Sequence, residues 1–295
     1  MRAAGLVNEV QACTGLQVKS YRKITKGWEN IILEVNDQYI FRFPMFRGSW
    51  SRMQKEFSLL PWLAPRLSVP IPAYEFIWDG DRSHPQRFAG YKKITGVPML
   101  KGNFRRAWVD RLGQDLGRLL TELHSFDLAD RELKTVKRHT VESWVESNRM
   151  FYRQIRKLVF PILNRTERAL AEAFWKQFFD EFTDYDFMPT LIHSDLTGGN
   201  ILIDPSKAKL TGIIDWGDAK VADPAFDFVG ILEVNKSLGQ RSMDCYGGPK
   251  SGFRERADLY LKTIPFGEIS WGVRQKSKHF VELGLRHLHQ RLPFP

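Results

Sequence analysis

The sequence predicts an α+β protein with two lobes, a small antiparallel sheet with one helix followed by a larger, mainly helical lobe. Two observations predict this class. As far as residue 96, short segments rich in β-branched and aromatic residues alternate with turn-forming Gly, Asn and Asp. From Trp108 onward, apolar residues recur at helical spacing instead. We therefore expect an N-terminal lobe at residues 1–96 and a C-terminal lobe at residues 97–295.

The N-terminal lobe is predicted from the alternation of strand-forming and turn-forming residues. Asn36 and Asp37 separate two apolar segments and indicate a hairpin. Residues 49–63 follow helical spacing, and Pro and Gly then interrupt the chain before the last strand. The expected strands are residues 16–25, 30–36, 38–43 and 88–94.

The C-terminal lobe is predicted from amphipathic and aromatic-rich helical segments. Residues 108–126 place their leucines on one helix face, and residues 140–182 continue with helical spacing. The many aromatic side chains of the second segment are expected to pack in the core rather than to bind a ligand. Residues 253–263 and 274–291 are the expected closing helices.

Cysteine content and apolar patterning limit the class of protein. Cys13 and Cys245 lie far apart, without a CxxC motif or a nearby His cluster. The sequence therefore predicts neither a disulfide framework nor a zinc site. Residues 1–18 contain polar residues where a secretory segment needs an unbroken apolar run. We expect a cytoplasmic protein without a membrane partner, and we expect it to be monomeric.

The net charge of +10 is unevenly distributed along the chain. Residues 1–96 carry 14 Lys and Arg against 8 Asp and Glu, whereas residues 180–227 carry 3 against 10. A basic segment followed by an acidic one fits an enzyme that binds polyphosphate and a divalent metal better than a nucleic-acid binder. No nucleic-acid-binding module is evident in the sequence, so we expect no nucleic-acid partner.

Two polar turns, each after a short apolar segment, carry the predicted chemistry. The first is H-S-D-L-T-G-G-N at residues 193–200, and the second is D-W-G at residues 215–217. Their order and spacing match the catalytic loop and the magnesium-binding loop of kinases. Asp195 can accept the proton of an attacking hydroxyl. Asn200 and Asp215 offer the hard oxygen ligands that magnesium prefers.

His193 opens the first turn, and we expect it to brace the catalytic loop by hydrogen bonds rather than to titrate. A metal hydrolase that uses His193, Asp195 and Asp215 is the alternative interpretation. The sequence lacks a helical H-E-x-x-H motif or a second His pair, so the kinase interpretation is preferred.

The segment around the second turn is more specific than either turn alone. Residues 213–228 read I-I-D-W-G-D-A-K-V-A-D-P-A-F-D-F. This segment resembles the I-D-[FW]-G-D-A…D-P-x-x-D-[FL] pattern of the aminoglycoside phosphotransferase family. Residues 26–30, 39–44 and 88–98 resemble blocks of its 2″-phosphotransferase branch, and the resemblance covers most of residues 16–235. It implies a protein-kinase-like fold, a phosphotransferase activity with ATP or GTP as donor, and Mg²⁺ as cofactor.

The resemblance also implies nucleotide-binding roles in the N-terminal lobe. Gly27 and Asn30 fall in the loop that covers the phosphates, where backbone amides can donate hydrogen bonds. Arg42 falls where the branch usually has the strand lysine that binds the α- and β-phosphates, and Glu56 falls on its ion-pair partner. Arg keeps the charge but presents a planar fork in place of a compact ammonium.

Tyr91, Lys93 and Ile94 lie in a segment that resembles the hinge, whose backbone groups hydrogen-bond the purine. Tyr91 falls at the position that limits the depth of the pocket, and a bulky residue there is compatible with GTP. An ordinary strand tyrosine is the alternative interpretation.

The resemblance implies a hydroxylated small molecule as acceptor, with an aminoglycoside antibiotic ranked first and antibiotic resistance as the associated role. A polycationic acceptor needs carboxylates near the base, and Asp218 and Glu233 are the candidates. Residues 233–241 contain one acidic and two basic residues, whereas the 2″ branch is typically acidic there. Kinases of macrolides, choline or homoserine share the same core, and a non-catalytic nucleotide-binding scaffold is a further alternative.

Overall fold

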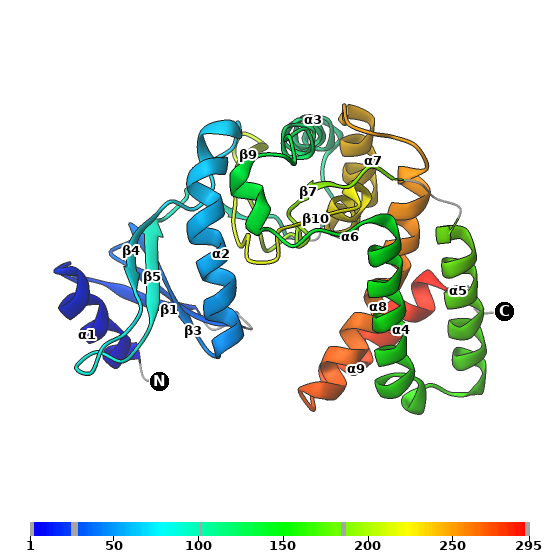
Figure 1. The fold of residues 1–295 in the computed structure, drawn as a ribbon, viewed down its shortest axis with the longest axis horizontal. Helices are drawn as coiled ribbons and strands as arrows, with labels where there is room; N and C mark the ends of the chain where they lie inside the picture. The colour runs from blue at the N-terminus through cyan, green and yellow to red at the C-terminus, as the bar shows by residue number, and fades with distance from the viewer. Residues whose placement is uncertain (1–2, 25–28, 101, 184–186, 293–295) are drawn as a thin grey trace. The chain divides into compact units, whose positions relative to one another are not determined.

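The computed structural model describes residues 3–24, 29–100, 102–183 and 187–292. The chain forms two compact units (Figure 1). The lobe boundary predicted after residue 96 stays a prediction. Each compact unit is made of three separate segments of the chain, so one boundary in the sequence does not separate the two units. The first unit comprises Met1–Leu100, Asp127–Val136 and Gly198–Ala219, and the second comprises Lys101–Phe126, Lys137–Thr197 and Lys220–Pro295.

The first unit is built on a five-stranded antiparallel sheet. Its strands are β1 (Tyr21–Ile24), β2 (Asn30–Val35), β3 (Tyr39–Pro44), β4 (Tyr74–Trp78) and β5 (Phe88–Lys92), in the order β1-β2-β3-β5-β4. Asn36 and Asp37 form the turn between β2 and β3, both in the left-handed region with a φ of 54°. Asn and Asp tolerate this conformation better than most side chains, which explains why the predicted hairpin turns here.

Two helices, α1 (Ala3–Thr14) and α2 (Arg47–Leu63), lie on opposite faces of this sheet (Figure 1). Side chains of a strand alternate between the faces, so Phe41 and Phe43 join the core beneath α1. Arg42, between them, faces α2 and bonds to Glu56 there. The alternation therefore places one buried cation on the α2 side of an otherwise apolar strand.

The sequence did not predict α1 or β4. Helix α1 buries Leu6, Val7 and Val10, a short apolar stripe that was not recognised from sequence alone. Strand β4 follows Pro70 and Pro72, which indicated an interruption of the chain rather than the approach to a strand. Both elements become recognisable only through the tertiary contacts that they make.

A second, three-stranded sheet in the first unit positions the D-W-G turn. It consists of β6 (Val97–Pro98), β8 (Ile201–Asp204) and β9 (Lys209–Ile213), paired antiparallel in the order β6-β8-β9. Gly96 precedes β6 with a φ of +129°, and a Cβ there would lie 2.2 Å from Thr211 Oγ1. Only glycine permits both this conformation and this close approach. Asp215 lies two residues after the end of β9, so the sheet determines where its carboxylate emerges.

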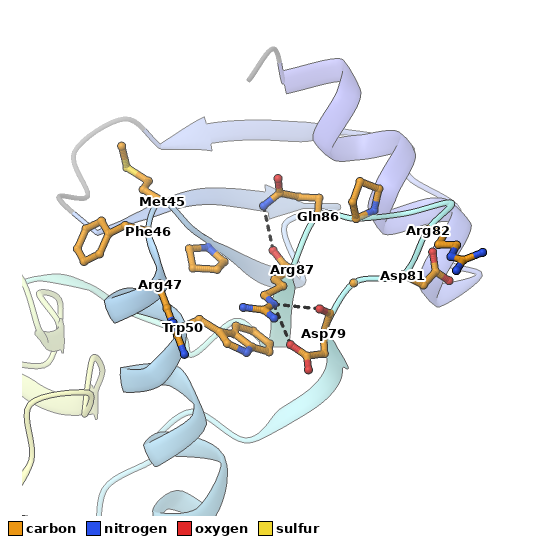
Figure 2. A pocket seen from close by; sticks show the side chains of 12 residues that line it. Met45, Phe46, Arg47, Trp50, Asp79, Asp81, Arg82, Gln86 and Arg87 are labelled. Atoms are coloured by element: carbon orange, nitrogen blue, oxygen red, sulfur yellow. Dashed lines mark hydrogen bonds and ion pairs between the residues drawn. The ribbon is translucent and has the colours of Figure 1, made fainter.

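The connection between β4 and β5 folds back toward the start of α2. A cavity of about 700 Å³ lies there (Figure 2). The Arg87 guanidinium lies over the Trp50 ring, 5.7 Å from its centroid, and forms an ion pair with Asp79 at 2.9 Å. Side-chain contacts therefore hold this connection to α2 and to the end of β4.

The second unit is mainly helical, which confirms the predicted α+β class. The helical segment expected over residues 140–182 consists of two helices, separated by a 3₁₀ turn at Phe160–Ile162 that contains Pro161. The helices are α3 (Arg106–His124), α4 (Val141–Leu158), α5 (Arg165–Thr183), α6 (Val229–Val234), α7 (Lys236–Cys245), α8 (Phe253–Arg274) and α9 (Lys278–Arg291), and β7 (Thr190–Ile192) pairs antiparallel with β10 (Lys220–Ala222). Among the residues that the structure describes, no helix combines the length and apolarity needed to cross a bilayer.

The aromatic side chains of α5 pack in the core of the second unit, as predicted. The ring centroid of Trp175 lies 5.2 Å from that of Phe178 and 5.5 Å from that of Phe266 on α8. All three residues are buried. Their contribution is therefore the burial of large apolar surfaces in one cluster.

Helix α8 runs past Pro265 to Arg274, whereas the sequence predicted a helix that ended at residue 263. Proline has no amide hydrogen, so it leaves the carbonyl four residues earlier without its helical donor. That carbonyl belongs to Leu261, and it accepts a hydrogen bond from Arg291 Nη1 at 2.9 Å. The other Arg291 nitrogen, Nη2, pairs with Glu233. A side chain of α9 therefore supplies the hydrogen bond that the Leu261 carbonyl loses to the proline in α8.

Replacing Arg291 with Met is expected to lower the free energy of unfolding by about 1–3 kcal/mol, since it leaves a carbonyl and a mostly buried Glu233 unsatisfied. Urea denaturation at pH 7 measures this change. Arg286→Met, an exposed position on the same helix, is the matched control and is expected to change stability by less than about 0.5 kcal/mol. Equal effects of the two substitutions would show that Arg291 does not stabilise the interrupted helix.

Candidate functional site

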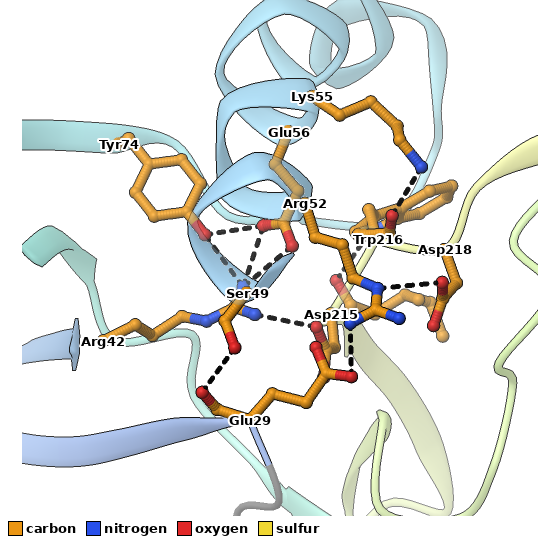
Figure 3. A network of polar contacts seen from close by, with 12 residues as sticks. Glu29, Arg42, Ser49, Arg52, Lys55, Glu56, Tyr74, Asp215, Trp216 and Asp218 are labelled. Atoms are coloured by element: carbon orange, nitrogen blue, oxygen red, sulfur yellow. Dashed lines mark hydrogen bonds and ion pairs between the residues drawn. The ribbon is translucent and has the colours of Figure 1, made fainter. Parts of the chain in front are cut away.

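Arg42 is the centre of a polar network in the first unit (Figure 3). Its Nη1 donates to both carboxylate oxygens of Glu56, at 2.9 and 2.8 Å, and to the Tyr74 hydroxyl at 2.9 Å. The Tyr74 hydroxyl in turn donates to Glu56 Oε2 at 2.5 Å. Arg42 Nη2 donates to Asp215 Oδ1 at 2.8 Å. The ion pair predicted between Arg42 and Glu56 is present, and the guanidinium extends from it to the D-W-G turn.

In this network, burial and the charge of neighbouring groups have opposite effects on the pKa of Arg42 and on that of Glu56. Burial alone would lower the pKa of Arg42, but the nearby acidic groups raise it well above its usual value. Burial raises the pKa of Tyr74, which keeps its hydroxyl protonated as a donor. Burial also raises the pKa of Glu56, against the opposing effect of Arg42. Arg42 therefore stays positively charged. Of its two carboxylate partners, Glu56 is buried and Asp215 is half exposed to solvent.

Asp215 has an unusual backbone and a partly open side chain. Its φ is 66°, a left-handed conformation that costs a non-glycine residue about 1–3 kcal/mol unless the surroundings impose it. Its side chain is 48% exposed. The Ile214 amide donates to the Asn200 carbonyl at 3.0 Å, so the backbone brings the two predicted metal ligands onto neighbouring turns of one unit.

Two cations of α2 hold the segment that follows Asp215. Arg52 pairs with Asp218 at 3.3 Å and with Glu29 at 2.5 Å. Lys55 Nζ donates to the Gly217 carbonyl at 2.6 Å. Sequence analysis missed both, although Arg52 lies four residues before Glu56 and therefore on the same helix face. That spacing was the available signal.

The second unit holds the catalytic loop through a buried carboxylate, Asp227. Its Oδ2 accepts from the His193 amide at 2.8 Å, and its Oδ1 accepts from the Ser194 amide at 2.7 Å. His124 Nε2 lies 3.1 Å from Oδ2. Ser194 has a φ of 72°, so these bonds hold a left-handed residue directly before Asp195. Asp227 is the last aspartate of the D-P-x-x-D motif, and sequence analysis had not given it this role.

His193 lies at the start of the same loop and is fully buried. The Asp195 amide donates to its Nδ1 at 3.2 Å. This contact is of the bracing kind expected for His193, although its part in catalysis stays a prediction. Asp195 belongs to the second unit, whereas Asn200 and Asp215 belong to the first.

The first aspartate of the D-P-x-x-D motif anchors α8. Arg256 donates to both oxygens of Asp223, from Nε at 2.7 Å and from Nη2 at 3.1 Å. The Tyr260 hydroxyl and the Ala225 amide also donate to this carboxylate, at 2.8 and 3.0 Å. Asp223 and Asp227 are buried, so these two members of the acidic segment at residues 180–227 serve the fold.

The predicted nucleotide-binding residues occupy several different environments. Tyr91 is buried in β5, with its ring edge-on to Tyr74 at 5.3 Å. Asn30 is buried at the start of β2, and its Oδ1 has no hydrogen-bond partner among the residues that the structure describes. Ile94 is half-buried beside Gly212. Gly27 lies outside the described residues.

Lys93 is engaged through both its backbone and its side chain. Its amide donates to the Gln38 carbonyl at 2.7 Å, and its ammonium pairs with Glu34. Arg22 also bonds to Glu34, at 2.5 Å. Burial would raise the pKa of Glu34, but the hydrogen bonds from Lys93 and Arg22 lower it to about 2. The Lys93 side chain therefore stabilises the sheet in this structure.

The lowered pKa of Glu34 leads us to expect an acid-dependent loss of stability. Because the folded pKa lies below the ordinary value, Glu34 stabilises the fold above about pH 4.5, by about 1–2 kcal/mol once solvent screening of its partners is included. This contribution disappears as the pH falls from about 4.5 to about 2. The test compares urea unfolding of the wild type and Glu34→Gln across this range, with the exposed Glu75→Gln as control. A stability difference between wild type and Glu34→Gln that stays constant with pH would contradict this account.

The two candidate substrate carboxylates differ in their exposure. The Asp218 side chain is 49% exposed beside Arg52. The Glu233 side chain is 14% exposed and pairs with Arg291, so a substrate ammonium would have to displace that cation. Both assignments stay predictions, and the geometry favours Asp218.

Comparisons with known proteins agree with this architecture. A complex of an APH(2″) enzyme with GDP and kanamycin superposes with a TM-score of 0.86 at 24% identity, covering 97% of this chain and 98% of that one. The macrolide 2′-phosphotransferase MphH of Brachybacterium faecium gives a TM-score of 0.72 at 18% identity, covering 98% of each chain. At these identities the likeness shows the fold, which is the predicted protein-kinase-like one.

Sequence comparison identifies the family. A protein of Bacillus subtilis (strain 168), "Uncharacterized protein YcbJ", is 46% identical over 55 residues, which are 19% of this chain and 18% of that protein. The match thus spans about a fifth of the relative's length. The profile of APH, the phosphotransferase enzyme family, matches residues 20–244. Because this match covers more than half of the chain, the protein belongs to the APH phosphotransferase enzyme family.

Proposed function

We propose that the protein transfers the γ-phosphoryl group of a magnesium-bound nucleoside triphosphate to a hydroxyl of a small molecule. The observation that carries the proposal is the position of Arg42, a buried cation that bridges Glu56 and the half-exposed Asp215. A fixed cation beside an accessible carboxylate supplies partners for phosphate oxygens and for a metal ion. Membership of a phosphotransferase family supports the same chemistry.

Asp195 is the proposed catalytic base. Phosphoryl transfer requires an acceptor oxygen in line with the phosphorus and a group that takes its proton. The bonds from the preceding amides to Asp227 hold the backbone from which the Asp195 carboxylate extends. A loop fixed in this way keeps the carboxylate in one position without reorganisation during the reaction.

The oxygen donors of the first unit fit a magnesium ion. Asn200 and Asp215 lie on backbone turns joined by the Ile214 amide, and the Asp215 side chain is half exposed. When bound, magnesium would neutralise phosphate charge and orient the transferred group. Arg42 keeps one oxygen of Asp215 in place and can bind phosphate oxygens as a planar donor.

An aminoglycoside is the acceptor that we rank first. The exposed carboxylate of Asp218, three residues after Asp215, suits an ammonium group of a polycation. The APH(2″) relatives were solved with kanamycin or gentamicin, which supports this ranking. The structural likeness to macrolide phosphotransferases favours a macrolide as the second candidate. The donor is ATP or GTP, since relatives were solved with GDP and with ADP.

A coupled assay of nucleoside diphosphate release tests the function. Purified protein is given Mg²⁺, either ATP or GTP, and a panel of aminoglycosides, macrolides and small alcohols including choline and homoserine. Acceptor-dependent release with an aminoglycoside, and a phosphorylated product by mass spectrometry, would support the proposal in full. Release with another acceptor would replace the substrate assignment, and tight nucleotide binding without any transfer would favour a scaffold.

Replacing Asp215 with Asn is expected to weaken binding of the magnesium-nucleotide complex by at least about 10-fold, because a direct metal ligand is lost. Calorimetric titration with and without Mg²⁺ measures this effect, which should vanish when the metal is omitted. The exposed Asp258→Asn on α8 is the control. If the Asp215 variant bound the nucleotide as the wild type does, Asp215 would not be a magnesium ligand.

A further inference from the structure

A cluster of three metal-binding side chains lies in the first unit, apart from the Arg42 network. Glu9 and Cys13 belong to α1, and His84 belongs to the connection between β4 and β5. One ligand atom from each residue lies within 4.8 Å of the others. We propose that these residues form a binding site for a zinc-class transition metal, which fastens α1 to the β4–β5 connection.

The distances between the ligand atoms are close to those of a tetrahedral metal site. Glu9 Oε2 lies 3.2 Å from His84 Nδ1. With zinc bonds of about 2.0–2.3 Å to oxygen, nitrogen and sulfur, two tetrahedral ligand atoms lie about 3.3–3.6 Å apart. The Glu9–His84 pair is already close to this separation, and the sulfur of Cys13 lies within 4.8 Å of both atoms.

The local structure holds each ligand near its position before any metal binds. Glu9 and Cys13 are four residues apart on a helix, so they lie on the same face one turn apart. Asp81 Oδ1 accepts from the Ser83 amide at 2.8 Å and from the His84 amide at 2.6 Å. The Trp78 indole donates to the His84 carbonyl at 2.9 Å. The backbone of His84 is therefore fixed by its own connection, which runs beside α1 (Figures 1 and 2).

The chemistry of the ligands favours zinc over magnesium or calcium. Thiolate and imidazole are soft to borderline donors that select zinc, cobalt and related ions, whereas magnesium and calcium prefer oxygen donors alone. Three protein ligands leave a fourth position for water, which is common in zinc sites that are not closed. The three residues are half-buried, so an ion can reach them from solvent.

Sequence analysis had predicted no zinc site because neither cysteine lies in a CxxC motif or near a His cluster. The ligands come from two separate segments, with Glu9 and His84 75 positions apart. Only the packing of α1 against the sheet brings them together. A search for short motifs cannot detect a site of this kind.

Titration of tag-free, reduced protein with Co²⁺ tests the site, since a cobalt–thiolate bond gives a charge-transfer absorption band. We expect one Co²⁺ to bind per chain, Zn²⁺ to displace it, and Cys13→Ser to abolish the band. Cys245→Ser is the matched control and should retain it. His84→Ala should weaken Zn²⁺ binding more than about 100-fold, since changes outside the direct ligands already cost about 10- to 100-fold.

A second measurement keeps the test independent of folding defects in the variants. Zn²⁺ should raise the Tm of the wild type and of Cys245→Ser, but not that of Cys13→Ser, while circular dichroism confirms that all three are folded. A cobalt band that survives Cys13→Ser, or the absence of any band in the wild type, would overturn the proposal. Neither measurement depends on phosphotransferase activity.

Discussion

Replacing Asp195 with Asn is expected to lower kcat by about 10²–10⁴-fold while leaving the Kd for the magnesium nucleotide unchanged. An amide has nearly the shape of a carboxylate but cannot accept the proton of the acceptor hydroxyl. The loop itself should persist, because His193 and Asp227 bind its backbone rather than the Asp195 side chain. Steady-state kinetics with the acceptor found in the panel assay, together with nucleotide titration, separates the two quantities.

The matched control for this variant is Asp258→Asn, an exposed aspartate on α8. It should leave kcat and KM as in the wild type. Unchanged turnover of Asp195→Asn would remove Asp195 from its role as base. A loss of nucleotide binding in the same variant would show instead that the residue positions the donor, since only a pure base leaves ground-state binding intact.

The parts of the fold that sequence predicts well are those where local signals agree with tertiary structure. The hairpin at Asn36 and Asp37 and helix α2 fall within two residues of their expected positions. Helix α8 shows where local reasoning fails. The helix expected at residues 253–263 continues past Pro265 to Arg274. Arg291, 30 residues away from Leu261, donates to the carbonyl that the proline leaves without a helical partner.

The candidate site divides in the same way. Asp195, Asn200 and Asp215 could be named from spacing because they lie in two short turns with a characteristic order. Asp227 could be recognised as part of the D-P-x-x-D motif. Its hydrogen bonds to two backbone amides of the catalytic loop depend on tertiary structure, which residue spacing does not predict. The same holds for Lys55, whose target is a backbone carbonyl rather than a recognisable side chain.

Replacing Arg256 with Met is expected to lower the free energy of unfolding by about 3–5 kcal/mol, because it leaves the carboxylate of Asp223 buried without its cation. Both side chains are almost fully buried, at 2% and 0% exposure. The Tyr260 hydroxyl and the Ala225 amide remain as donors, but neither neutralises the charge. Chemical denaturation of the wild type and the variant, with a second probe to verify two-state unfolding, measures the loss.

Arg254 provides the comparison that separates burial from charge. It lies two residues away on α8 and pairs with Asp244 at 2.6 Å, but both side chains are about half exposed. Arg254→Met should therefore cost no more than about 1 kcal/mol. The double variant Asp223→Asn/Arg256→Met should be more stable than Arg256→Met alone, because it leaves no buried charge. The amide oxygen can still accept from the Ala225 amide, and the amide NH2 can donate to the Tyr260 hydroxyl. If the double variant were less stable than Arg256→Met, the loss would come from packing around the guanidinium rather than from the isolated carboxylate.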